Sequence, residues 1–112
     1  MNTAATIGAA ISVAAGVLGF LWPHQVSKTI GLGLPSRLAL SEFRATYGGL
    51  FVGAGVAVLV IGSSDAARVL GAAWAGAFIA RALSVVIDRS RSRENIAGLI
   101  IEAAVAALLL IG

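Results

Sequence analysis

The chain has 112 residues, of which 59% are hydrophobic and only 12% charged, whereas soluble domains carry about 25% charged residues, so a water-soluble globular protein is disfavoured. It has no Cys and a single His, which excludes a disulfide framework, a thiolate metal site and a His-pair haem or zinc site within one chain. The net charge of +3 lies mainly in expected loops, so we interpret it as a topology signal rather than a nucleic-acid-binding surface.

Four apolar segments are long enough to cross a bilayer, which takes about 20 mainly apolar residues. They cover about 4–22, 40–62, 66–87 and 96–112, and they predict a single all-α domain. The predicted architecture is an integral membrane four-helix bundle with up-down-up-down topology. No Lys or Arg precedes the first segment, so we predict an uncleaved helix rather than a signal peptide.

The connections between these segments differ in length. The segment from Pro23 to Ala39 is the longest, and we expect it to lie at headgroup level, with a functional lid as the alternative. Ser63-Ser64-Asp65 predicts a tight turn, so the second and third helices should form an antiparallel hairpin with Asp65 as a helix cap. A short polar loop, 88–94, joins the last two helices.

Basic residues are concentrated in the first and third loops. These loops contain Lys28, Arg37, Arg89, Arg91 and Arg93, and the other side contains Arg68. The positive-inside rule places the first and third loops in the cytoplasm. We therefore expect a multi-pass protein of the bacterial inner (plasma) membrane with both termini facing outward.

Charged side chains inside the expected spans are the most informative feature of the chain. A charge within hydrocarbon costs several kcal/mol, so it usually has a partner or a function. Arg81 and Glu102 each lie six residues from the third-loop end of their helices, or about 9 Å deep. Matched depth on neighbouring helices predicts an ion pair, in which the arginine and carboxylate could be bidentate.

Two further charges lie near the start of the second helix. Glu42 and Arg44 are two residues apart, or about 200° around a helix, so they cannot face the same partner. Charge favours Glu42 opposite Arg81, while Arg44 is expected to bond Glu102 or extend to lipid phosphate. Tyr47, one turn deeper, could donate its hydroxyl to Glu102.

Three interpretations of this polar network remain open. It could specify helix register only, it could bind substrate or relay protons, or it could contact the charges of a partner subunit. Small residues at four-residue spacing likewise predict close helix packing, either within the bundle or onto another membrane protein. They are Gly8, Ser12 and Gly16 in the first helix, Gly49 and Gly53 in the second, and Ala72, Gly76 and Ala80 in the third.

Catalysis is not predicted. The single His24 lies in a loop, where no Ser-His-Asp set can be assembled around it. Gly31 and Gly33 are not followed by Gly-Lys-Ser/Thr, so they do not form a phosphate loop. We expect no enzyme activity, no cofactor and no metal. The basic loop 88–93 is either a topology determinant or a contact with anionic lipid headgroups.

The stretch Glu42-Phe43-Arg44-Ala45-Thr46-Tyr47-Gly48-Gly49, with Arg81 and Glu102 downstream, resembles a family of small bacterial four-helix membrane proteins of unknown function. That family carries Arg-x-x-Tyr-Gly-Gly on its second helix, an Arg late in the third and a Glu in the fourth. In size, helix number and composition, the chain also looks like the small accessory subunit of mycobacterial Mce lipid importers. Small multidrug-resistance transporters are similar in length, but their essential Glu lies in helix one, where this chain has no acid.

Two functions follow as expectations. The first is a non-catalytic accessory subunit of a larger inner-membrane complex, which stabilises a lipid (Mce-type) transporter. Its partners would be membrane lipids and other integral subunits, such as a transporter permease. The alternative is a small transporter or lipid-binding membrane protein whose site contains Arg44, Arg81 and Glu102. That alternative requires a cavity beside these residues.

Overall fold

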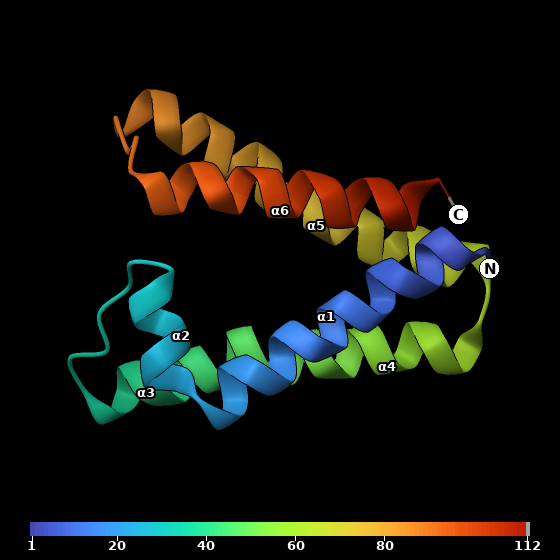
Figure 1. The fold of residues 1–112 in the computed structure, drawn as a ribbon, viewed down its shortest axis with the longest axis horizontal. Coiled ribbons are helices and arrows are strands. Elements are labelled where there is room, and N and C mark those ends of the chain that lie inside the picture. The colour runs from blue at the N-terminus through green and yellow to red at the C-terminus, as the bar shows by residue number, and fades with distance from the viewer. Residues whose placement is uncertain (112) are drawn as a thin grey trace.

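The computed structural model describes residues 1–111, and these residues are helical with no strand. The all-α prediction is therefore confirmed (Figure 1). In chain order the elements are α1 (Thr3–Leu21), α2 (Pro23–Thr29), α3 (Arg37–Arg44), the π-helical segment η1 (Ala45–Leu50), α4 (Phe51–Ile61), α5 (Ser64–Ile87) and α6 (Arg93–Leu110).

Polar side chains define where the long helices begin. Asn2, Ser36, Ser63 and Ser92 precede α1, α3, α5 and α6, and each accepts a hydrogen bond from the backbone N–H three residues later. Such caps satisfy N–H groups that have no partner within the helix. The predicted cap at Asp65 is wrong, because Ser63 caps α5 and Asp65 instead pairs with Arg68 at 3.2 Å.

Three helices are long and apolar enough to cross a membrane: α1, the continuous helix Arg37–Ile61 and α5. The continuous helix comprises α3, η1 and α4, so it begins at Arg37 rather than at about 40, and it contains a π-helical turn that the sequence did not predict. The predicted fourth span, α6, is a helix of 18 residues that also contains Arg93, Glu94 and Glu102. Because α6 is only 18 residues long, it has no apolar stretch of spanning length that leaves these charges out, whereas the longer helices have one.

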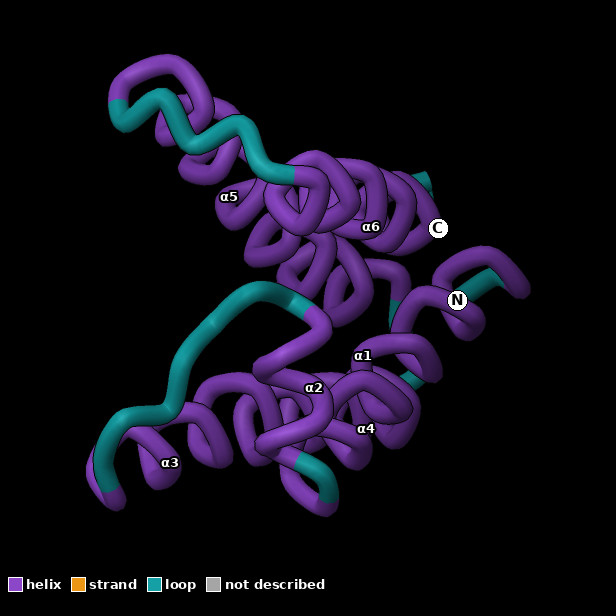
Figure 2. The backbone as a smooth tube through the Cα atoms, turned by 60° about the vertical axis from the view of Figure 1, so that its left-hand side comes forward, coloured by secondary structure: helices purple, strands orange, loops and turns teal. Residues whose placement is uncertain are grey.

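The helices are arranged as two antiparallel pairs. In one pair α1 packs along η1 and α4, and in the other α5 packs along α6. The pairs meet beside the chain termini and diverge toward the end that carries α2, α3 and the α5–α6 loop, as two views show (Figures 1 and 2). The molecule measures 39 × 31 × 16 Å, so it is flat. The predicted four-helix bundle with up-down-up-down topology is therefore confirmed only in its all-helical content.

The hydrophobic core lies at the end where the two pairs meet. Its buried members come from α1, α4, α5 and α6, and they are Ala5, Ala9, Val58, Ala67, Leu70, Trp74, Val105, Ala106 and Leu109. Many are small, so the helices approach closely there. Leu109 is the largest side chain that is fully buried. Because the core occupies one end, the space between the pairs stays open at the other.

Small residues of α1 lie in contacts within the chain. A Cβ on Gly8 would lie 2.8 Å from Leu109, and one on Gly16 would lie 2.7 Å from the Gly48 carbonyl. The buried Ser12 hydroxyl donates to the Phe51 carbonyl at 3.1 Å. This face of α1 therefore packs within the protein.

Other predicted packing residues are exposed. A Cβ on Gly53 or Gly76 would meet nothing within 4 Å, and Gly49, Ala72 and Ala80 are exposed. Ala80 lines the cavity between the helix pairs, and the other four lie at exposed positions of η1, α4 and α5. Docking of these residues onto another membrane protein, the second alternative, stays a prediction. Close packing in these helices instead involves glycines that the four-residue pattern missed, namely Gly48, Gly55 and Gly71.

Candidate functional site

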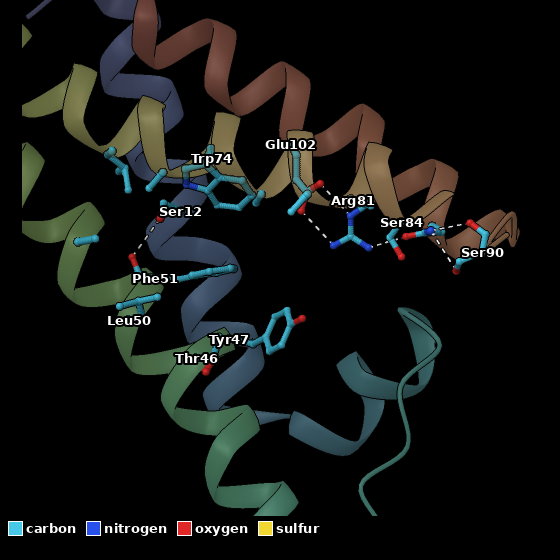
Figure 3. Close-up of a pocket in the computed structure, with 16 residues that line it drawn as sticks. Ser12, Thr46, Tyr47, Leu50, Phe51, Trp74, Arg81, Ser84, Ser90 and Glu102 are labelled. Carbon is cyan, nitrogen blue, oxygen red and sulfur yellow. Dashed lines mark hydrogen bonds and ion pairs between the residues drawn. The ribbon is translucent and has the colours of Figure 1, made fainter. Parts of the chain in front are cut away.

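A cavity of about 620 Å³ lies between the two helix pairs. Its apolar wall is formed by α4, α5 and the end of η1, with Leu50, Phe51, Leu70, Ala73, Trp74 and Ala77. Its polar end lies toward the α5–α6 loop, with Tyr47, Arg81, Ser84, Ser90, Asn95 and Glu102 (Figure 3). The cavity thus has a polar end and an apolar end.

The ion pair between Arg81 and Glu102 is the centre of the polar end. Arg81 Nε donates to Glu102 Oε1 at 2.8 Å, and a terminal nitrogen donates to Oε2 at 3.0 Å. This bidentate geometry joins α5 to α6, as the matched depth of the two residues predicts. The Glu102 side chain is 9% exposed and that of Arg81 is 32% exposed, so the arginine is the member of the pair that a molecule in the cavity can contact.

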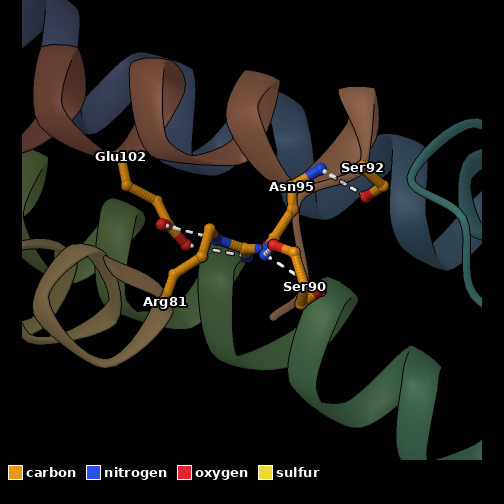
Figure 4. Close-up of polar contacts among 5 residues, drawn as sticks. All are labelled: Arg81, Ser90, Ser92, Asn95 and Glu102. Carbon is orange, nitrogen blue, oxygen red and sulfur yellow. Dashed lines mark hydrogen bonds and ion pairs between the residues drawn. The ribbon is translucent and has the colours of Figure 1, made fainter. Parts of the chain in front are cut away.

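Asn95 extends the network along α6. Its side-chain oxygen accepts from the second terminal nitrogen of Arg81 at 2.8 Å, and its amide nitrogen donates to the Ser90 carbonyl at 2.7 Å (Figure 4). Arg81 is therefore held by two residues on one helix, and the loop is fixed to the same cluster. The sequence prediction missed Asn95 and Ser90, although Asn95 lies seven residues before Glu102, which is two helical turns.

Gly98 provides the space for the arginine head. A Cβ at this position would lie 2.8 Å from Arg81 Cζ and 2.9 Å from Nε. The guanidinium thus lies against the backbone of α6, and a larger residue would push it toward the cavity. Gly98 precedes Glu102 by four residues, which is the helical spacing of a shared face and is the signal that could have identified it.

The opposite wall of the cavity contains η1. Two glycines, Gly48 and Gly49, lie in this π-helical turn, and glycine weakens the ordinary helical alternative. π-Helical turns inside α-helices occur often at functional sites. The turn carries Tyr47, whose ring stacks on Phe43 at 4.7 Å and meets Phe51 edge-on at 5.8 Å. Phe51 in turn lies 5.1 Å from Trp74, so an aromatic row crosses from one helix pair to the other.

Only part of the predicted five-residue network comes together. Arg81, Glu102 and Tyr47 line the same cavity, with Tyr47 on the wall opposite the ion pair (Figure 3). The expected contacts of Glu42 with Arg81 and of Arg44 with Glu102 are wrong. Arg44 is exposed, and its Cζ lies 5.4 Å from the Phe20 ring, while Glu42 is exposed near the end of α3. Both charges face away because the helix pairs diverge at that end.

The chemistry of the cavity is that of a neutral binding site. The charges of Arg81 and Glu102 cancel, and the surrounding wall is mostly apolar and aromatic. Residues 1–111 contain no group of three or more His, Cys, Asp or Glu side chains that could hold a metal ion. The available groups can hold and orient a molecule by hydrogen bonds and apolar contact.

The chain belongs to the family described as a domain of unknown function, DUF4345, whose model matches residues 1–112. The sequence-based expectation of a small uncharacterised family is therefore confirmed at that level. No curated protein and no solved structure matches the chain.

Proposed function

We propose, from the premise that the chain is a member of this uncharacterised family, that it is a non-enzymatic membrane protein that binds a small amphiphilic molecule between its two helix pairs. The main observation that supports this proposal is the cavity beside Arg81 and Glu102. The ligand's apolar part would lie along the aromatic and alanine wall. Its polar part would meet the ion pair and Tyr47.

The size and lining of the cavity support binding rather than a purely structural ion pair. Small-molecule sites typically enclose about 300–1,000 Å³ and combine apolar walls with a few polar groups. The cavity has about 620 Å³ and the same division. A pair that only fixed helix register would need no space beside it, whereas Arg81 remains 32% exposed.

Four membrane crossings fit this proposal. α5 has 24 residues and would be about 36 Å long, which exceeds the roughly 30 Å hydrocarbon core of a bilayer. α6 would be the fourth span, because its one charge at depth, Glu102, is paired with Arg81 and its other charges lie in the first turn. The four spans would run up-down-up-down, with α2 at headgroup level.

The orientation follows from the basic loops. Lys28, Arg37 and the arginines of the α5–α6 loop lie at the end where the helix pairs diverge (Figure 1). By the positive-inside rule this end faces the cytoplasm of a bacterial inner membrane, and both termini face outward. The cavity would then open near the cytoplasmic leaflet, where a lipid-soluble molecule could enter between the pairs.

A cavity-filling substitution tests the proposal. Ala77 lines the cavity and is exposed, so Ala77→Phe should fill the space without disturbing the core. The matched control is Ala57→Phe, which alters an exposed position of α4 away from the cavity. Each protein is purified in mild detergent, and co-purifying small molecules are identified by mass spectrometry. We expect one amphiphile with wild type and the control, and its loss with Ala77→Phe. Equal recovery from all three would refute the proposal.

A second candidate is a non-catalytic accessory subunit of a larger inner-membrane complex, such as a lipid transporter of the Mce type. The supporting observation is that small residues are exposed on two helices, Gly49 and Gly53 on η1 and α4 and Ala72 and Gly76 on α5. Such surfaces permit close approach of another protein's helices. A pull-down from native membranes should recover a stoichiometric integral subunit, and Gly53→Leu should release it. Recovery of the chain alone would exclude this role.

A further inference from the structure

We propose that the ligand of this cavity is an uncharged amphiphile whose polar end carries carbonyl oxygens that accept hydrogen bonds from Arg81 and Tyr47. This inference rests on the proposed function, because it assigns the chemical class of molecule that the same cavity binds. The shared chemistry is a neutral carbonyl end on an apolar body, which isoprenoid-type quinones and diacylglycerol esters both provide.

The charge balance at the polar end excludes an anionic head. Glu102 already neutralises Arg81 through two hydrogen bonds, and its side chain is 9% exposed. An anionic head beside Arg81 would therefore add a second negative charge within a few ångströms of Glu102. In an apolar surrounding, like charges repel more strongly than in water. A cationic head is disfavoured in the same way by Arg81, which is the more exposed member of the pair.

The hydrogen-bonding groups that face the cavity are mainly donors. A guanidinium has five N–H donors. Three of these N–H groups are used, two by Glu102 and one by Asn95, and two remain on the terminal nitrogens. Across the cavity Tyr47 directs its hydroxyl into the space, and no hydrogen bond joins it to the other residues drawn (Figure 3). A ligand that supplies acceptors would satisfy both walls at once.

The hydrogen-bond acceptors at the polar end already have donors within the chain, so they do not compete for a donor on the ligand. Both Glu102 oxygens accept from Arg81, and the Asn95 side-chain oxygen accepts from the same arginine. The Ser84 hydroxyl donates to Asp88 at 2.6 Å. The strong acceptors of the polar end thus have partners within the chain. A carbonyl oxygen matches what is left better than an alcohol or an amine.

The apolar wall accommodates the body of such a molecule. The aromatic row of Tyr47, Phe51 and Trp74 begins at the polar end and continues toward the core, with successive ring centroids 5.8 and 5.1 Å apart. Ala73 and Ala77 of α5 line the same cavity, and their small side chains leave space beside the row. A ring or an acyl chain attached to a carbonyl could therefore lie on the row while the oxygen reaches Arg81.

Three probes of similar chain length test the inference. They are decylubiquinone, dioctanoylglycerol and decanoate, each added to the full chain in a non-ionic detergent, with affinity measured by native mass spectrometry. We expect a neutral probe to bind at least about tenfold more tightly than decanoate. Tyr47→Phe keeps the ring and should weaken the neutral probe by about two- to tenfold, the value of one hydrogen bond. Ala77→Phe should abolish binding, and Ala57→Phe should not change it.

The outcomes separate this inference from the function on which it rests. Tighter binding of decanoate that Ala77→Phe abolishes would overturn the neutral-carbonyl assignment and leave the amphiphile-binding function standing. If no probe binds, or if Ala77→Phe does not affect the binding of any probe, both the neutral-carbonyl assignment and the amphiphile-binding function are overturned. If Tyr47→Phe leaves the affinity for the neutral probes unchanged, Tyr47 donates no hydrogen bond to the ligand, and the proposal that both Arg81 and Tyr47 bind the carbonyl end is overturned. Preference for the quinone or the glyceride would identify the source of the carbonyl.

Discussion

The two ends of the molecule have similar residues and different structures. Near the termini, α1, α4, α5 and α6 enclose a core around Leu109 and Trp74. Toward the α5–α6 loop the same helices diverge around a cavity that contains Arg81 and Glu102. The difference lies in the alanines, because Ala5, Ala9 and Ala67 are packed between helices at the first end, whereas Ala73, Ala77 and Ala80 line open space at the second. Hydrophobicity alone therefore does not distinguish core from site.

The largest expected effect comes from breaking the ion pair that supports the open end. Glu102→Ala leaves Arg81 without its carboxylate, and loss of one partner of a buried pair costs about 3–5 kcal/mol. Because Arg81 is 32% exposed, we expect the lower end of that range, about 3 kcal/mol. The measurement is the free energy of unfolding in mixed micelles.

A double variant separates charge from packing in this experiment. Arg81→Met with Glu102→Leu replaces the pair by apolar side chains, and such replacements are often neutral for stability. We expect it to be more stable than Glu102→Ala. If the double variant is less stable than Glu102→Ala, the pair supports the fold by something other than mutual neutralisation.

The closed end should respond almost as strongly to loss of packing. Leu109 is fully buried and lies against Gly8 of α1 and Gly71 of α5, so Leu109→Ala should cost about 2 kcal/mol, the lower end of the range for such truncations. Leu83, on α5, is 55% exposed and provides the control, for which Leu83→Ala should change stability by less than about 0.5 kcal/mol. Similar losses for the two variants would mean that the end with Leu109 is not the core of the protein.

Sequence reasoning identifies the long helices, the tight turn and the Arg81–Glu102 contact, since these depend on local composition and on depth along neighbouring helices. It misses the short helix α2, which it assigned to a loop. It fails at the relative placement of helices. Glu42 and Arg44 are charged, as Arg81 is, and nothing in the sequence shows that they are exposed. They are exposed because the two helix pairs diverge at their end of the molecule. Helical spacing gives the angle of a residue around its own helix, whereas the neighbour on that side depends on the whole fold.

The same reason explains which glycines pack. Gly49 and Gly53 form the pattern typical of close helix contacts, but Gly48 and Gly55, seven residues apart on the adjoining face, make the contact with α1. The π-helical turn at η1 contributes, because a wide turn rotates the residues beyond it relative to an ordinary helix. The glycine pattern thus predicts that a contact exists and leaves the side of the helix open.

Two glycines on one helix sharpen this point. A Cβ on Gly55 would lie 2.9 Å from the Ala9 carbonyl and 2.7 Å from Val13, so Gly55→Ala must separate α4 from α1. We expect it to cost about 1–3 kcal/mol, the range for overpacking. Gly53→Ala meets nothing within 4 Å and should stabilise the helix by up to about 1 kcal/mol. Thermal unfolding in detergent distinguishes them, and the same sign for both would contradict the assigned contact face.

The smallest expected effect lies at the boundary between the two ends. Ser12 is buried on α1, lines the cavity and donates to the Phe51 carbonyl at 3.1 Å. Ser12→Ala removes this hydrogen bond and keeps the small volume, so the cost should be about 0.6 kcal/mol, the average for polar contacts between membrane helices. Ser41→Ala, at an exposed position of α3, is the control and should have no measurable effect. Phe51 is the middle residue of the aromatic row, so its position affects the cavity wall. If Ser12→Ala lowers the free energy of unfolding by well over 1 kcal/mol and also weakens amphiphile binding, Ser12 positions this wall in addition to joining two helices.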